Sequence, residues 1–250
     1  MATPPLLDTV LSVHGGRTHW MLVDRIEGAL SSGGLAFALH GQAHALRGLR
    51  VVVWPHAVRV ELRDYVRPGW TGVWTRQHVA LHDERGTVKR ERLQPRASFE
   101  RWSRQVHWDA LDMLYFAGYA LWNYLSFPFV LAQPGVTVTV APVRPGGAAT
   151  VRLDARFDPD IPTHSPQQRF WLDAQGYLLR HDYTADVIGR LATAAHLCQA
   201  AESVSGLRFY TRRRVVPRFG QRLVLPGPTL VWIELDALRV IRRSFSVPTP

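Results

Sequence analysis

The sequence predicts a mainly β (α+β) fold, in which a large curved antiparallel sheet, or half-open β-barrel, wraps round an aromatic helical plug and follows a short N-terminal helix. Two observations lead to this fold class. Along most of the 250 residues, apolar side chains alternate with polar ones, which is typical of strands with one dry and one wet face. One segment, 107–131, is instead apolar nearly all round at helical spacing, and such a helix has to be buried.

The first element predicted is the short N-terminal helix. Pro4 and Pro5 suit its first turn, because the backbone N–H groups there have no partner within a helix. Apolar residues then recur three or four positions apart as far as Val13, and the pair Gly15-Gly16 ends the run.

The strand pattern is clearest between residues 57 and 65, where Val58, Val60 and Leu62 face one way and the charged residues between them face the other. Similar short segments, including 35–40, give about eleven to thirteen antiparallel strands joined by short turns. No linker divides the chain and no internal repeat is present. We therefore expect one domain over 1–250, with 107–131 as a helical insertion.

The helical segment is expected to fill the concave side of the sheet and to leave an apolar cavity beside it. Aromatic side chains on the helix and on the strands would then form the walls that an apolar ligand contacts. The alternative is that these residues only complete the core and leave no cavity. The candidate substrate-binding residues are Tyr115, Tyr119, Trp122, Trp54, Trp74, Trp171 and Trp232.

The chain carries 30 Lys and Arg residues against 20 Asp and Glu, which gives a formal net charge of +10. All of the basic residues except Lys89 are arginines, and they are spread along the sequence. The densest run, Arg212-Arg213-Arg214, would alternate between the two faces of a strand. Because nucleic acids bind to continuous basic surfaces, no nucleic-acid partner is expected.

The composition favours a folded protein of the cytoplasm. Hydrophobic residues make up 46% of the chain, and no stretch approaches the roughly 20 apolar residues that span a bilayer, so no stable membrane insertion is expected. The first residues lack the basic and apolar regions of a secretory signal. Cys198 is the only cysteine and has no basic neighbour in the sequence, so we expect an inert buried thiol. Nothing in the sequence indicates a particular oligomeric state.

No cofactor is expected, because the sequence has no phosphate-binding loop, no dinucleotide-binding glycine motif, no nucleophile elbow and no zinc-protease motif. The first candidate catalytic residues are His181 and Tyr183, which alternation places on one face together with Tyr177 and Leu179. An imidazole and a phenol two residues apart can act as base and acid on one substrate. The alternative for His181 is a core histidine that is hydrogen-bonded to a neighbour.

The Pro-rich loop 158–165 supplies two more candidate catalytic residues, Asp160 and His164. It follows a predicted strand, and loops at the rim of a sheet often carry function, so these side chains can contribute general acid–base catalysis. No paired-cysteine or His-x-His pattern supports a metal site, and no metal is expected. The alternative is a structural turn.

Six segments of the sequence carry a resemblance to a known family: 14–16, 35–41, 114–119, 163–165, 173–184 and 211–215. They resemble a large, mostly uncharacterised bacterial family with the half-barrel fold of the lipoprotein carriers, the Lol type. The resemblance implies a hydrophobic cavity, because Lol-type carriers hold acyl chains in the half-barrel. These carriers are also exported proteins. The resemblance also allows chemistry without a cofactor, because the violacein-pathway rearrangement enzyme resembles the same fold.

The function that these observations favour is a cytosolic cyclase or isomerase of biosynthesis. It would bind a hydrophobic, natural-product-like small molecule and catalyse its cyclisation, rearrangement or isomerisation without a cofactor. One alternative is a non-catalytic carrier of a lipid or another hydrophobic ligand. A weaker alternative is an arginine-rich module that binds an acidic surface or nucleic acid.

Overall fold

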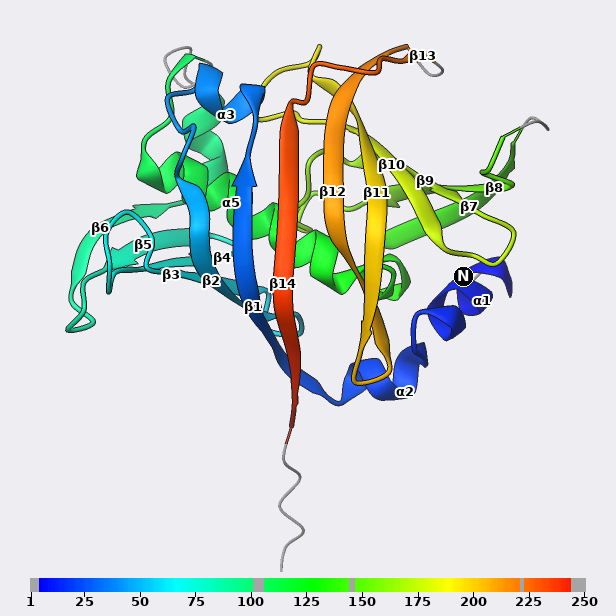
Figure 1. The fold of residues 1–250 in the computed structure, drawn as a ribbon, viewed down its shortest axis with the longest axis horizontal. Coiled ribbons are helices and arrows are strands. Elements are labelled where there is room, and N and C mark those ends of the chain that lie inside the picture. The colour runs from blue at the N-terminus through cyan, green and yellow to red at the C-terminus, as the bar shows by residue number, and fades with distance from the viewer. Residues whose placement is uncertain (1–4, 101–105, 144–146, 221–222, 244–250) are drawn as a thin grey trace, which may run out of the picture.

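In the computed structural model, which describes residues 5–100, 106–143, 147–220 and 223–243, a strongly curved antiparallel sheet surrounds helix α5 (Ala110–Ser126) (Figure 1). The predicted curved sheet around a helical plug is therefore confirmed. Within the described residues the sheet has 14 strands. They are β1 (Val23–Gly33), β2 (Leu46–Trp54), β3 (Arg59–Arg63), β4 (Thr71–Thr75), β5 (His78–His82), β6 (Val88–Leu93), β7 (Val136–Pro142), β8 (Val151–Phe157), β9 (Gln167–Leu172), β10 (Leu178–Thr184), β11 (Thr193–Val204), β12 (Leu207–Phe219), β13 (Leu223–Val224) and β14 (Val231–Arg242).

Two meanders make up the sheet, whose strand order is β6-β5-β4-β3-β2-β1-β14-β12-β11-β10-β9-β8-β7, with β13 paired to β12 beside this path. The meanders meet where the first strand pairs with the last, so that Ile26 lies opposite Val240 and Leu30 opposite Leu235. Among the described strands, β6 and β7 form the two outer edges. The half-barrel is thus open between the two strands that α5 separates in the sequence.

The predicted N-terminal helix is α1 (Pro5–Val13), although Pro4 lies outside the described residues. It buries one apolar face, which includes Leu7 and Val10. Gly15 ends the helix with φ 110°, a backbone conformation that favours glycine. The chain then enters a second short helix, α2 (Gly16–Met21), before the first strand begins.

The strand predicted over 35–40 is wrong, because Leu35–Leu39 forms helix α3. Gly34, with φ 132°, turns the chain out of β1, and the backbone N–H of Ala36 donates to Leu230 O. The segment LAFAL contains no β-branched residue, and its Leu and Ala residues are good helix formers, so its apolar character reflects packing of Phe37 and not a strand.

The alternation predicted for residues 57–65 is confirmed within β3. Val60 and Leu62 are completely buried in the core, and Glu61 lies on the outer face between Arg59 and Arg63. Glu61 forms ion pairs with both arginines, at 2.7 and 3.2 Å. The outer face thus carries paired charges, and the concave face carries the apolar side chains that pack on α5.

The start of α5 is fixed by its cap and by the edge strand β6. The Asp109 carboxylate accepts from the backbone N–H groups of Leu111 and Asp112, and the Asp112 side chain accepts from the N–H of Asp109. Arg92 of β6 donates to both carboxylates, at 2.7 Å to Asp109 and 2.6 Å to Asp112. A reciprocal cap of this kind defines the first residue of the plug.

Gly118 is the point of closest approach between α5 and the sheet. A Cβ atom there would overlap the Trp74 side chain and would lie 2.7 Å from its Cδ2 atom. We expect Gly118→Ala to lower the free energy of unfolding by about 1–3 kcal/mol, the usual cost of overpacking a core. Urea denaturation measures this, with Gly147→Ala as the control, because a Cβ at Gly147 would meet no atom within 4 Å. Equal stability of the two variants would contradict this packing.

Candidate functional site

A group of histidines and tyrosines is buried between α5 and strands β9 to β12, on the concave side of the sheet. We call it the His–Tyr cluster. Each member exposes 5% of its surface or less, although the surrounding core is apolar. The members are Tyr119, Tyr124, His164, His181, Tyr183 and His196.

His164 lies at the centre of this cluster and contacts three tyrosines. The Tyr119 hydroxyl is 3.1 Å from Nδ1 of His164, and the Tyr124 hydroxyl is 2.6 Å from Nε2. The Tyr183 ring stacks on the imidazole, with 3.9 Å between ring centroids, and its hydroxyl lies 3.4 Å from that of Tyr124. Both nitrogens of His164 are thus joined to phenols, which makes a continuous path for a proton.

The other two histidines of the cluster face each other across strands β10 and β11, where His181 pairs with His196. His181 Nε2 is hydrogen-bonded to Gln168 Oε1 at 2.5 Å, and its ring stacks on Phe170. Neither ring nitrogen of His196 has a hydrogen-bond partner within the described residues, and the side chain is completely buried. A buried polar group without a partner is costly, so His196 marks a place where a polar partner would be stabilising.

Burial keeps the cluster uncharged at neutral pH. It lowers the pKa of His164 to about 3, helped by the nearby Arg96 charge, and it lowers the pKa values of His181 and His196 well below 6.5. It also raises the pKa of Tyr183 to about 12 and the pKa of Tyr124 well above 10. The imidazoles are therefore acceptors without a charge, and the phenols keep their protons.

A small apolar cavity lies against the cluster. Its volume is about 30 Å³, room for about one or two water molecules. Tyr124 and Tyr183 reach it from the cluster, and Phe37, Phe116 and Ile233 are among its apolar walls. The helical plug thus fills most of the half-barrel and leaves a narrow space where the phenols meet apolar side chains.

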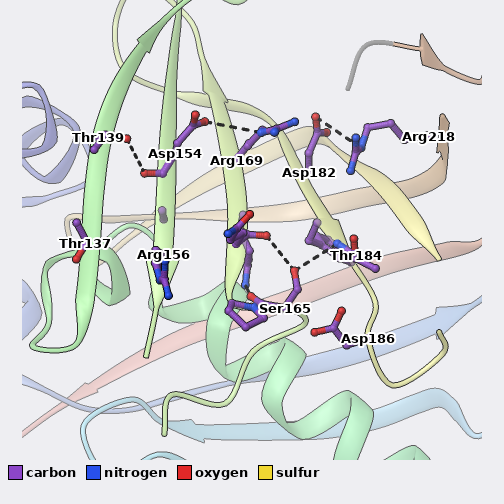
Figure 2. A pocket seen from close by; sticks show the side chains of 15 residues that line it. Thr137, Thr139, Asp154, Arg156, Ser165, Arg169, Asp182, Thr184, Asp186 and Arg218 are labelled. Carbon is purple, nitrogen blue, oxygen red and sulfur yellow. Dashed lines mark hydrogen bonds and ion pairs between the residues drawn. The ribbon is translucent and has the colours of Figure 1, made fainter. Parts of the chain in front are cut away.

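A much larger cleft, of about 730 Å³, lies on the outer face of β7 to β10 (Figure 2). Figure 2 shows a row of side chains that crosses the strands with alternating charge, and ion pairs join Asp154 to Arg169 at 4.0 Å and Asp182 to Arg218 at 3.9 Å. Thr139 continues the row on β7. Because its charges are paired, the row is polar without a net excess of either sign.

The floor of this cleft lies where β9 and β10 separate. Their pairing ends at Asp182 and Arg169, and Ser165 bridges the gap beyond: its Oγ donates to Gln167 O at 3.0 Å and accepts from Thr184 N at 3.3 Å. Tyr183 lines both this cleft and the apolar cavity. A single layer of residues therefore separates the outer cleft from the cluster.

The structure brings together three of the four predicted catalytic residues, His164, His181 and Tyr183. Asp160 is exposed on its loop and lines a separate hollow with Asp158. Alternation along β10 holds for His181 and Tyr183, whereas a register shift between Leu178 and Arg180 places Leu178 in the core. Leu179, predicted to share the face of His181, is only half-buried.

The predicted aromatic residues divide between the two faces of the sheet. Tyr115, Tyr119, Trp122 and Trp74 are buried around α5, and the Trp122 indole donates to Pro55 O at 2.9 Å. The other three are half-buried beneath arginines on the outer face, away from the concave side. These pairs are Trp54 with Arg59, Trp171 with Arg180 and Trp232 with Arg47.

Sequence reasoning missed Tyr124, His196 and Arg213. Arg213 is 2% exposed, donates to the carbonyls of Tyr210 and Tyr124, and lies over the Tyr124 ring at 4.7 Å. Its guanidinium is also 3.8 Å from Sγ of Cys198, so this thiol has a basic neighbour in space that the sequence did not reveal. Burial nevertheless raises the pKa of Cys198. The signal that could have found Arg213 and His196 is alternation within β12 and β11.

Within the described ranges, no three His, Cys, Asp or Glu side chains are grouped so that they could hold a metal ion. In the part of the chain that the structure describes, no helix is long and apolar enough to cross a membrane.

Two solved structures are similar to this one over nearly its whole length. A DUF1329 family protein from Desulfovibrio piger shares 12% of residues, with a TM-score of 0.50 over 94% of this chain and 91% of that one. A LolA superfamily protein from Nitrosomonas europaea shares 9%, with a TM-score of 0.52 over 96% and 93%. No protein-family model and no curated protein matches the sequence. The likeness shows the fold, and the predicted Lol-type half-barrel is confirmed.

Proposed function

We propose that this half-barrel binds a hydrophobic small molecule and catalyses its cyclisation, rearrangement or isomerisation without a cofactor. The observation that carries the proposal is the His–Tyr cluster, an uncharged network of imidazoles and phenols in an otherwise apolar interior. Such reactions need a proton to be moved and a reactive conformer to be held, and both can be supplied by a dry, rigid pocket. A cytoplasmic location is part of the same proposal.

The acid and the base are assigned from the pKa directions. Tyr183 keeps its proton, since burial raises its pKa to about 12, and its hydroxyl can donate to a substrate oxygen. His164 is neutral and can take up a proton through Tyr124, whose hydroxyl lies between His164 and Tyr183. An imidazole with a pKa near 3 is a weak base. The role of His164 is therefore to relay a proton between the tyrosine hydroxyls, and it does not remain protonated.

Access to the cluster requires a side chain to move, because the apolar cavity is small. Tyr183 stands between that cavity and the outer cleft. Beyond the last paired residues of β9 and β10, the Ser165 hydroxyl bridges the two strands through one hydrogen bond to each. Rotation of Tyr183 would join the two spaces. A ligand would then place its apolar part against Phe37 and Phe116 and its polar group beside the Tyr183 hydroxyl.

The first test identifies a ligand and then its turnover. Native mass spectrometry of the purified protein reveals a co-purified molecule, and that molecule is supplied as substrate. We expect His164→Ala and Tyr183→Phe each to lower the rate by about 100-fold or more, the usual contribution of general acid–base catalysis. His44→Gln, which removes an exposed imidazole, is the control. Unchanged rates in both cluster variants would refute the acid–base assignment.

A non-catalytic carrier is the second candidate, favoured by the apolar lining of the inner cavity. A carrier would retain its ligand unchanged through purification, and Tyr183→Phe would leave the affinity nearly unaltered. A product that differs from the supplied molecule favours the enzyme.

A further inference from the structure

A further pocket lies at the C-terminal end of α5, and it shares no lining residue with the His–Tyr cluster. Residues of α2, of the β2–β3 turn, of α5 and of η2 (Phe129–Ala132) form its walls. Its volume is about 420 Å³, within the range of pockets that hold small molecules. It therefore has the space that the interior of the half-barrel lacks.

Four of the residues that line this end pocket carry aromatic rings. Trp20 stacks on Phe129 with 4.5 Å between ring centroids and 7° between ring planes, and the His56 ring packs against Trp20 at 5.5 Å between centroids. Trp122 also lines the pocket. Flat, rigid walls of this kind favour a planar aromatic ligand, since ring stacking contributes beyond the buried area.

Two polar atoms in the lining have no hydrogen-bond partner within the described residues. The Ser126 hydroxyl belongs to a side chain that is 3% exposed, and the Gln133 amide nitrogen is also buried. A buried donor without a partner destabilises the free protein, so a ligand that offers an oxygen to Ser126 would bind more tightly than one that does not.

The charge of the lining is positive. Arg17 and Arg76 line the pocket, and no Asp or Glu does so among the described residues. Arg17 forms an exposed ion pair with Asp8 at 3.1 Å. Arg76 is exposed and makes no ion pair with any described residue, although it also borders the hollow that contains Asp158 and Asp160. Arg76 is thus the better anchor for an anion.

We propose that this end pocket binds an aromatic carboxylate that also carries a hydroxyl group at its far end. The carboxylate pairs with Arg76 at the rim, and the hydroxyl bonds to Ser126 in the interior. The opposite orientation is disfavoured, because Ser126 is the last residue of α5, where the helix dipole is negative.

Isothermal titration calorimetry of the intact protein tests the proposal with 6-hydroxy-2-naphthoate, 2-naphthoate and 2-naphthamide. The hydroxylated acid should bind most tightly and the amide most weakly. Arg76→Gln should weaken binding of both acids by about fivefold and leave the amide unaffected, as expected for an exposed ion pair. Ser126→Ala should remove the advantage of the hydroxylated acid, about fivefold, without lowering the thermal stability, because it deletes a hydroxyl that lacks a partner.

Arg190→Gln is the matched control, since Arg190 is exposed and lines none of these pockets. Equal affinity for the acids and the amide would overturn the proposal, as would an Arg76→Gln variant that binds as the parent does. A Ser126→Ala variant that loses stability would assign Ser126 to the fold instead. None of these outcomes depends on catalysis at the His–Tyr cluster.

Discussion

At pH 5 the protein is expected to have lost about 7–8 kcal/mol of the free energy of unfolding that it has at pH 7. Four buried histidines cause this loss. Burial lowers the pKa of His14 to about 4 and that of His164 to about 3, and it lowers the pKa values of His181 and His196 well below 6.5. In the unfolded chain each imidazole takes up a proton as the pH falls below 6.5, whereas in the folded chain it stays neutral. The stability is therefore complete above pH 6.5 and is lost below it.

The size of the loss follows from proton linkage, since each such histidine contributes about 2 kcal/mol between pH 7 and pH 5. Because domains are stable by about 5–15 kcal/mol, the protein should be close to unfolding at pH 5. Burial raises the pKa values of Asp182 and Asp186, and this makes their effect on stability opposite to that of the histidines. These two carboxyls favour the folded state as they gain protons, so they oppose the loss only near the acid end of the range.

Guanidinium denaturation between pH 7.5 and pH 5 measures this dependence. His196→Phe replaces an imidazole that has no hydrogen-bond partner among the described residues with a ring of similar shape, so it should reduce the pH dependence by about a quarter. His44→Gln removes an exposed imidazole and is the control. A stability that is constant from pH 7 to pH 5 would show that the buried histidines are protonated in the folded protein.

Much of the fold could be predicted because the two faces of the sheet differ so strongly. Val60 and Leu62 are buried, and Arg59 and Arg63 are paired with Glu61 on the wet face. Such alternation is typical of a strand with one face in the core and the other in solvent. The plug was predictable for the same reason, since α5 is apolar all round. The helix at Leu35–Leu39 was not, because five apolar residues carry too little periodicity to distinguish a helix from a strand.

The candidate site could be predicted only where local alternation decides it. His181 and Tyr183 share a face by their spacing, but His164 joins them from a loop, and His196 from the partner strand. Those contacts depend on which strands pair, and spacing along the chain does not determine this. The outward placement of Trp54 could not be predicted, because the run of valines before it shows no alternation that would reveal which face each residue takes.

Replacement of Arg213 by alanine is expected to lower the free energy of unfolding by about 2–5 kcal/mol, as other large-to-alanine changes in a core do. Its guanidinium is buried and donates to the carbonyls of Tyr210 and Tyr124, at 3.1 and 3.3 Å. The alanine variant leaves both carbonyls without this donor and opens a cavity over the Tyr124 ring. Urea denaturation at pH 7.5 measures the loss. The adjacent Arg212→Ala is the control, because Arg212 pairs with Asp236 on the exposed face and should cost at most about 1 kcal/mol.

Arg213→Met separates the charge from the packing. Methionine fills most of the space of the arginine stem, so it should restore part of the stability lost in the alanine variant. The positive charge of Arg213 contributes to the lowered pKa values of His181 and His196, so both values should rise in the methionine variant. The pH dependence of stability should then become shallower than in the parent at the acid end of the range, where the folded protein first takes up protons on these histidines. If Arg213→Met matches the parent in both stability and pH dependence, the arginine side chain only fills space. Its positive charge then has no effect on the pKa values of the histidines.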